Sequence, residues 1–171
     1  SAARATAVRE SNTAAPTAAE IAAGFTVAGD FDFIELINLH ATLPLSLTGV
    51  RFTLGITFDF TGSAVTSLAP GQRVVVAKNP AAFAIRYRSG EAQVAGPYSG
   101  NLNDDGEAIT LVDAANATIQ NFTYDDTGAG WHPSTDGAGF SLERIAPELP
   151  PGTSAAWRAS RLPGGSPGAG G

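Results

Sequence analysis

The chain has no cysteine, no methionine, a single lysine and no long hydrophobic run. Without cysteine it can form no disulfide, no thiolate zinc site and no cysteine nucleophile. No apolar run approaches the ~20 residues that a membrane-spanning helix needs, so no membrane span is expected. Because the chain starts at Ser1 and lacks methionine, we expect a fragment or a processed form of a longer protein.

Charged residues are also scarce, at 15% of the chain against 43% hydrophobic residues. Thr, Ser, Asn and Gly must therefore cover much of the surface. Ten basic and 16 acidic residues give a formal net charge of -6, and the sequence contains no basic run. Such a chain repels phosphate backbones, which argues against nucleic-acid binding.

The length of 171 residues suits one domain with a single core. Residues 162–171 consist almost entirely of Gly, Pro, Ser and Ala, which predicts a flexible linker. Residues 1–15 are rich in alanine and predict either an N-terminal linker or a first strand, with residues 5–10 as the strand segment.

Segments in which apolar and polar residues alternate, bounded by Gly and Pro, indicate half-buried strands. These segments cover residues 33–38, 47–52, 52–60, 74–77, 107–112, 118–124 and 139–145. Residues 113–116 form a tight connection of the hairpin type. Short strands with regular turns predict an all-β, antiparallel β-sandwich with one or two short helices.

Two short helices are expected beside the strands. Thr17 and Glu20 have the spacing of a capping box, and Gly24 is placed to end that helix. Asn79 is a suitable N-cap for the second helix, because Pro80 then occupies the first helical position, where no N–H is needed. Phe83 and Tyr87 would share one face of this helix, which we expect to cover one end of the core.

The order and spacing of several motifs resemble the lamin tail domain over residues 4–168. The motifs are residues 33–38, Leu47-Thr48-Gly49-Val50, Leu68-Ala69-Pro70-Gly71 before Val74-Val75-Val76-Ala77, Asn79-Pro80, Asp105-Gly106-Glu107, and Asp136-Gly137 before Ser141-Leu142-Glu143-Arg144. The nearest likeness is to the bacterial form found in large secreted or surface proteins. The domain itself is placed at residues 4–161. Structural roles are expected for Glu35, Asn38, Gly49, Pro70, Gly71 and Pro80.

The resemblance implies an immunoglobulin-like β-sandwich without a catalytic site. It also implies a non-catalytic interaction or tethering module within a larger extracellular or cell-surface bacterial protein. Its partners would be other protein domains or a cell-surface component, and no cofactor is expected. The alternative is an accessory, carbohydrate-binding domain attached to a secreted hydrolase or nuclease. A third hypothesis, an independent metal-dependent enzyme, lacks a visible cluster of acid, base and nucleophile.

Glu35 stands out because it lies in an otherwise apolar strand. A buried carboxylate needs hydrogen-bond donors. We therefore predict that Glu35 accepts from loop N–H groups or from an arginine such as Arg51 or Arg144. A catalytic role is the weaker hypothesis, because one carboxylate without a partner is not a mechanism.

The segment 101–106 places oxygen-bearing residues at alternate positions before a glycine, like the start of a calcium loop. The likeness ends at Val112, where such a loop needs a bidentate Glu. Turn-forming Asn and Asp before a strand explain the segment better. The weak calcium candidates are Asn101, Asn103, Asp105, Asp125 and Asp126.

Aromatic residues in loops are the candidates for contact with a ligand or a partner. Tyr98 and Trp131 are the two contact candidates, and Trp157 lies near the expected linker. Exposed Tyr and Trp suit sugar stacking or a protein partner, whereas the alternative for each is packing in the core.

Overall fold

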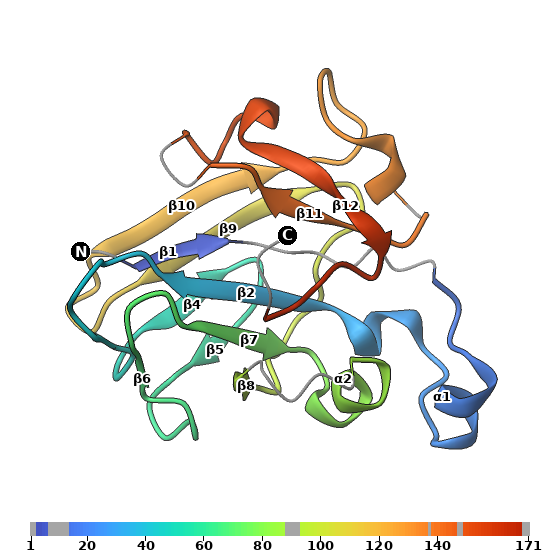
Figure 1. Ribbon diagram of the computed structural model, residues 1–171, viewed down its shortest axis with the longest axis horizontal. Helices are drawn as coiled ribbons and strands as arrows, with labels where there is room; N and C mark the ends of the chain where they lie inside the picture. Colours follow the sequence, from blue (N-terminus) through green and yellow to red (C-terminus); the bar gives the residue numbers. More distant parts are fainter. Residues whose placement is uncertain (1–2, 7–13, 88–92, 137, 147–148, 169–171) are drawn as a thin grey trace.

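Two four-stranded β-sheets form the body of the computed structural model, which describes residues 3–6, 14–87, 93–136, 138–146 and 149–168 (Figure 1). The first sheet has the order β1-β2-β7-β8. Its strands are β1 (Ala3–Thr6), β2 (Phe33–Asn38), β7 (Arg73–Ala77) and β8 (Gln93–Ala95). The pairs β1·β2 and β2·β7 are antiparallel, whereas β7·β8 is parallel. Residues 3–6 are thus a first strand, while residues 7–10 of the predicted one lie outside the described residues.

The second sheet has the order β10-β9-β4-β5, and all of its pairs are antiparallel. Its strands are β4 (Arg51–Leu54), β5 (Phe58–Asp59), β9 (Glu107–Val112) and β10 (Thr118–Tyr124). The hairpin β9-β10 was predicted with these bounds. The single strand expected over residues 52–60 was wrong, because the chain reverses after β4 and β5 pairs back on it. Gly55 allows this reversal with a φ of +84°.

A C-terminal ribbon, defined as strands β11 (Phe140–Arg144) and β12 (Trp157–Pro163), adds a third sheet. Figure 1 shows it beside β9 and β10. A strand was predicted over residues 139–145, but β12 was not predicted. Leu142 and Trp157 of the ribbon are buried in the main core. The ribbon therefore contributes side chains to the main core of the sandwich.

The main core lies between the two sheets and is apolar. The first sheet contributes Ile34, Leu36, Val74 and Val76. The second contributes Phe52, Ile109, Leu111, Phe122 and Tyr124. Together these observations confirm the all-β, immunoglobulin-like sandwich.

A second buried cluster covers the outer face of the first sheet. It consists of Phe33, Val75, Ala77 and Phe83, with Tyr87 and Val94 packed against it. Phe83 belongs to α2 (Pro80–Arg86) and Tyr87 is its C-cap residue. This helix lies beside α1 (Ala18–Ala22) at one end of the sheet (Figure 1). The predicted helix therefore covers the outer face of this sheet rather than the space between the sheets.

Both helices begin at the predicted caps. Thr17 and Glu20 form a complete capping box, and the Asn79 side chain accepts from the N–H groups of Ala81 and Ala82. Pro80 occupies the first turn. Three 3-10 turns complete the helical elements of the described chain: η1 (Ala28–Phe31), η2 (Pro133–Thr135) and η3 (Ser154–Ala156).

Asn38, Pro70 and Gly71, three of the residues expected to be structural, flank or form connections of the first sheet. Asn38 is fully buried and donates from Nδ2 to the carbonyls of Leu43 at 3.0 Å and Leu68 at 2.9 Å. It thereby ties β2 to the loops around the small sheet of β3 (Leu45–Ser46) and β6 (Ser67–Leu68). Pro70 and Gly71 form the turn before β7, in which Gly71 has a φ of +75°.

A side chain added at Gly49 would be crowded by Ala114. An added Cβ would lie 2.6 Å from Cβ of Ala114, and the φ of Gly49 is +76°. Gly49→Ala should therefore lower the free energy of unfolding by about 2–4 kcal/mol, combining strain and overpacking. Gly62 is the matched control, because its φ is +81° with nothing within 4 Å of an added Cβ. Gly62→Ala should cost about 1 kcal/mol. Equal losses in urea unfolding of the two variants would contradict the crowding at Gly49.

The C-terminal segment differs from the predicted linker over residues 162–168. Strand β12 continues through Pro163, and both Gly164 and Pro167 are buried. The N–H of Gly164 donates to the carbonyl of Gly139 at 2.5 Å. Composition did not indicate this, because the segment is held by main-chain hydrogen bonds and not by its own apolar side chains.

Candidate functional site

The outer face of the first sheet carries the only buried acid of β2. Glu35 is 1% exposed, and its Oε2 accepts from the N–H of Gly168 at 2.5 Å. Its Oε1 accepts from Nη1 of Arg73 on the adjacent strand β7. A loop N–H and an arginine are thus its donors, as the sequence suggested. The arginine is neither Arg51 nor Arg144.

The two arginines proposed for Glu35 lie elsewhere. Arg51 donates from Nη1 to the carbonyls of Gly49 at 3.0 Å and Asp113 at 3.2 Å. Arg144 donates to the carbonyl of Leu149 at 2.6 Å. Arg73 reaches Glu35 because Val75, its neighbour two residues along β7, stands directly opposite Glu35 in the antiparallel register.

Burial raises the pKa of the Glu35 carboxyl above its ordinary value. The hydrogen bond from Gly168 and the charge of Arg73 oppose this shift, and the nearby Glu143 adds to it. Glu143 lies on β11 and pairs with Arg158 of β12 at 3.2 Å. A charge of the C-terminal ribbon is therefore close enough to Glu35 to act on its pKa.

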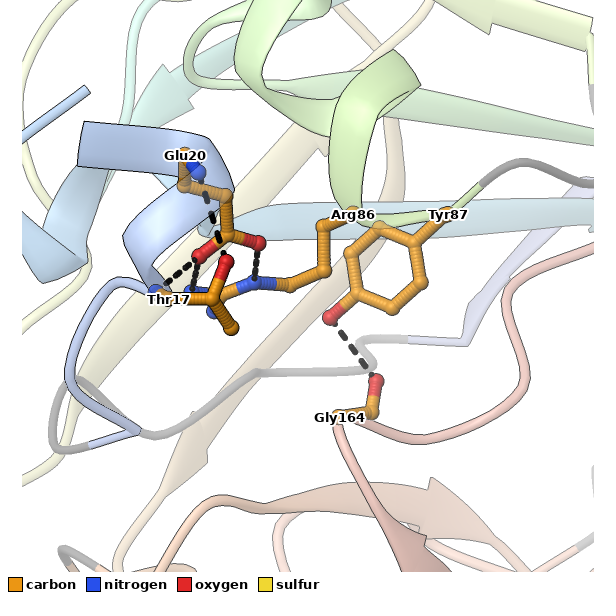
Figure 2. Close-up of polar contacts among 5 residues, drawn as sticks. All are labelled: Thr17, Glu20, Arg86, Tyr87 and Gly164. Carbon is orange, nitrogen blue, oxygen red and sulfur yellow. Dashed lines mark hydrogen bonds and ion pairs between the residues drawn. The ribbon is translucent and has the colours of Figure 1, made fainter. Parts of the chain in front are cut away.

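A second polar cluster joins the two helices, as Figure 2 shows. Glu20 of α1 accepts from Nε and Nη2 of Arg86 at the end of α2, both at 2.9 Å. The same carboxylate accepts from the N–H of Thr17 at 2.7 Å, closing the capping box. Hydrogen bonding to Arg86 lowers the pKa of Glu20 from 4.5 to about 2, against the opposing effect of burial.

A groove of about 480 Å³ opens beside this ion pair. Its walls include Thr17, Glu20, Arg86 and Tyr87, together with small residues of the two chain ends. The Tyr87 hydroxyl donates to the carbonyl of Gly164 at 3.0 Å, which Figure 2 also shows. The groove thus lies between the helices and the C-terminal segment.

The calcium candidates fall into two neighbouring loops. Asn101, Asn103 and Asp105 are exposed, and Oδ1 of Asn103 accepts from the N–H of Asp105 at 3.1 Å. Asn101 and Asn103 also line a groove of about 680 Å³, whose acidic wall residues are Asp32, Asp104 and Glu107. An added Cβ at Gly106 would lie 2.9 Å from Cα of Asp125, so the fold does bring the loops together.

The carboxylate of Asp125 is directed at its own loop. Its Oδ1 accepts from the N–H groups of Asp126, Thr127 and Gly128 at 2.7–3.3 Å. The hydrogen bond from Thr127 is the main cause of the lowered pKa of Asp125. Asp126 is 1% exposed. Among the described residues, no group of three or more His, Cys, Asp or Glu is arranged to hold a metal ion.

Calcium should therefore bind weakly at most. With a dissociation constant above 1 mM, 1 mM calcium would raise the free energy of unfolding by less than about 0.4 kcal/mol. Urea unfolding in 1 mM calcium and in excess chelator, with magnesium as the control cation, measures this difference. A clear stabilisation by calcium alone, removed by Asp125→Asn, would contradict the expectation.

The aromatic contact candidates are directed inward. Tyr98 is 3% exposed and belongs to the main core, so its predicted role in surface contact was wrong. Trp131 is half-buried and packs against the same core. Trp157 is 1% exposed, with its ring centroid 5.5 Å from that of Phe122. The bridge between Thr57 and Ser99 draws the Tyr98 loop toward the second sheet, which the local sequence did not indicate.

Comparison with known proteins gives one match. The family described as Lamin Tail Domain matches residues 9–126. The chain belongs to this family. No curated protein and no solved structure matches the chain significantly. This match confirms the resemblance to the lamin tail domain that the motifs indicated. The domains of this family are immunoglobulin-like and non-catalytic.

The lamin tail match stops before the C-terminal ribbon. β11 and β12 follow residue 126, yet Leu142 and Trp157 fill the main core and Gly168 contacts Glu35. This chain therefore completes its lamin tail fold with residues outside the family match. No helix in the described part is long and apolar enough to cross a membrane.

Sequence reasoning missed both the ion pair between Glu20 and Arg86 and the role of Tyr87. The capping box explained Glu20 locally, and Tyr87 was assigned only a helix face. One signal was available: Arg86 and Tyr87 end an apolar helix that starts at Pro80. Cations near a helix C-terminus are favourable, but nothing in the sequence named a partner in α1.

Proposed function

We propose that this lamin tail domain is a non-catalytic interaction and tethering module within a larger extracellular or cell-surface bacterial protein. The family match carries the proposal. It is supported by the large hydrophobic core between the sheets. It is also supported by the buried carboxylates Glu20 and Glu35, which are engaged by arginines within the fold and are not directed at a shared reaction centre.

A catalytic alternative would need an acid, a base and a nucleophile around one cavity. The groove beside Tyr87 holds Glu20 and Arg86, but these two side chains are bonded to each other. The second groove holds Asp32, Asp104 and Glu107, which are all carboxylates. In the first groove the hydroxyl of Tyr87 donates to the carbonyl of Gly164, and that of Thr17 accepts from the N–H of Glu20, so both are bonded within the fold.

The second candidate, a carbohydrate-binding accessory domain, rested on exposed aromatic residues. Tyr98 and Trp157 are buried, and Trp131 is half-buried against the core. Sugar stacking needs an open aromatic face. The interaction module is therefore the better supported proposal.

The test replaces the domain within its parent protein. One variant lacks residues 4–168, and a second carries an unrelated β-sandwich of similar size in their place. Cell fractionation and surface labelling then measure retention of the parent protein at the cell surface. We expect both variants to lose retention, while any enzymatic activity of the parent protein is unchanged.

Two results would contradict the proposal. Full retention in both variants would show that the domain tethers nothing. Retention restored by the unrelated sandwich would show that the domain acts only as a spacer. A loss of enzymatic activity on polymeric substrate, with retention intact, would instead favour the accessory domain.

A further inference from the structure

The C-terminal strap, defined as residues 164–168, lies on the outer face of the first sheet although it has almost no side chains. It contains three glycines, one serine and one proline. Gly164 and Pro167 are nevertheless buried. Figure 1 shows the segment that leaves β12 crossing in front of β2. Something other than apolar side chains must hold it there.

Two side chains of the sheet and helix layer hold the strap by its main chain. At one end the Tyr87 hydroxyl donates to the carbonyl of Gly164 at 3.0 Å. At the other end the carboxylate of Glu35 accepts from the N–H of Gly168 at 2.5 Å. A donor and an acceptor thus contact main-chain groups four residues apart. These contacts require no particular strap side chain.

The backbone conformation of the strap does restrict its sequence. Gly164, Gly165 and Gly168 have φ values of +83°, +72° and +82°. Residues with a Cβ adopt this region at a steric cost, so these three positions favour glycine. The proline at position 167 limits the freedom that the segment loses on docking. The backbone conformation, and not the two side-chain contacts, therefore favours a Gly- and Pro-rich segment.

We propose that Tyr87, Glu35 and the outer face of the first sheet form a binding site for Gly- and Pro-rich peptide segments, which the chain's own strap fills reversibly. The site gives the interaction module, on which this inference rests, a defined kind of partner. Docking buries few apolar side chains and makes few hydrogen bonds, so the strap opens more readily than the core. The groove of about 480 Å³ borders the start of the strap, since Gly164 and Gly165, together with the preceding Pro163, form one of its walls.

The first experiment measures whether the Tyr87 hydroxyl holds the strap. Tyr87→Phe removes this donor but keeps the ring that packs 5.5 Å from Phe33 and 4.7 Å from Phe83. Hydrogen exchange by mass spectrometry should show strap amides exchanging about 5-fold faster, as for one lost hydrogen bond. Tyr124→Phe is the matched control, because its hydroxyl donates to the carbonyl of Asn103 at 2.8 Å, away from the strap.

The second experiment supplies the segment in trans. Gly168→Pro removes the N–H that Glu35 accepts and is incompatible with a φ of +82°. In this chain the Glu35 end of the site is vacated, while Gly164 stays bonded to Tyr87 and Gly139. It should bind a fluorescent peptide of the sequence of residues 162–168 at least about 10-fold more tightly than the wild-type chain. The same peptide with alanine at the positions of Gly164 and Gly168 should bind neither chain.

Each result of the two experiments either supports or overturns the proposed binding site. Peptide binding to Gly168→Pro, lost on Glu35→Ala in that background, supports the site. A concentration-dependent dimer of the wild-type chain, abolished by Gly168→Pro, also supports it, with the strap of a second copy as occupant. Equal strap exchange in Tyr87→Phe and Tyr124→Phe, or no peptide binding to any chain, would overturn it. Either of these failures would leave surface tethering, which the domain replacement tests, unaffected.

Discussion

Replacing Trp157 by alanine is expected to lower the free energy of unfolding by about 3–5 kcal/mol, the usual cost of removing a fully buried tryptophan. The side chain is 1% exposed and packs on Phe122 of β10. Its Nε1–H donates to the carbonyl of Pro151 at 2.7 Å, which would be left without this donor in the variant. Truncation therefore removes packing and a hydrogen bond together.

Urea unfolding followed by far-UV circular dichroism measures this loss, because the remaining tryptophan, Trp131, is half-buried in the same region. Leu162→Ala is the control on the same strand, since Leu162 is 68% exposed and should change stability by less than about 0.5 kcal/mol. Similar losses in the two variants would show that the ribbon is not part of the core. A large loss of stability in Trp157→Ala but not in Leu162→Ala would show that the folded domain extends well beyond residue 126. The family match ends at that residue.

Glu20→Gln is expected to cost about 2–3 kcal/mol near pH 7, because it removes the negative charge that faces the poorly exposed guanidinium of Arg86. The side chain of Glu20 is 4% exposed and that of Arg86 is 13% exposed, so water screens the pair poorly. The guanidinium of Arg86 also lies 3.5 Å from the ring centroid of Phe31. Breaking the pair therefore loosens α1, α2 and η1 together.

The pH dependence of this loss distinguishes charge from packing. The folded pKa of Glu20 is about 2, below its ordinary value of 4.5. The ion pair therefore stabilises the fold above pH 4.5, and this stabilisation is lost as the pH falls toward 2. The difference between wild type and Glu20→Gln should shrink over this range. Glu35 acts in the opposite sense, because a raised pKa adds stability at acidic pH that is lost as the pH rises.

Unfolding midpoints measured from pH 7 to pH 2 test this prediction. Asp105→Asn is the control, because it neutralises an exposed carboxylate of similar size. We expect Asp105→Asn to change the stability at pH 7 by less than about 0.5 kcal/mol. A difference between wild type and Glu20→Gln that stays constant down to pH 2 would show that the loss comes from packing and not from the ion pair.

Features set by neighbouring residues could be predicted from the sequence. The capping box of Thr17 and Glu20 spans three residues, and the cap at Asn79 acts on the next turn. The hairpin β9-β10 was found from alternation on both sides of a short polar connection. In each case the energy that decides the structure comes from groups within about one turn of each other. Alternation failed at residues 52–60, because a reversal at Gly55 preserves the apolar pattern on both sides.

Features that join distant segments could not be predicted. Arg86 lies 66 residues from Glu20, and Gly168 lies 133 residues from Glu35. A buried carboxylate requires donors, so the sequence could state that Glu35 has them, but any of several arginines would satisfy that need. The register of β2 and β7 selected Arg73. Likewise, the residues around Tyr98 have the composition of a surface loop, and Tyr98 becomes buried only when the two sheets pack together.

By itself the sequence determined the all-β class, the helix ends, the main hairpin and the family, because alternation, caps and turns depend on residues that are close in the sequence. The tertiary structure decided which charges pair, which aromatic residues are buried, and that residues 164–168 dock on the first sheet. The physical reason is that a Gly- and Pro-rich segment carries little side-chain information. Its place is set by main-chain hydrogen bonds to Glu35 and Tyr87, whose positions exist only once the sheets and α2 have packed.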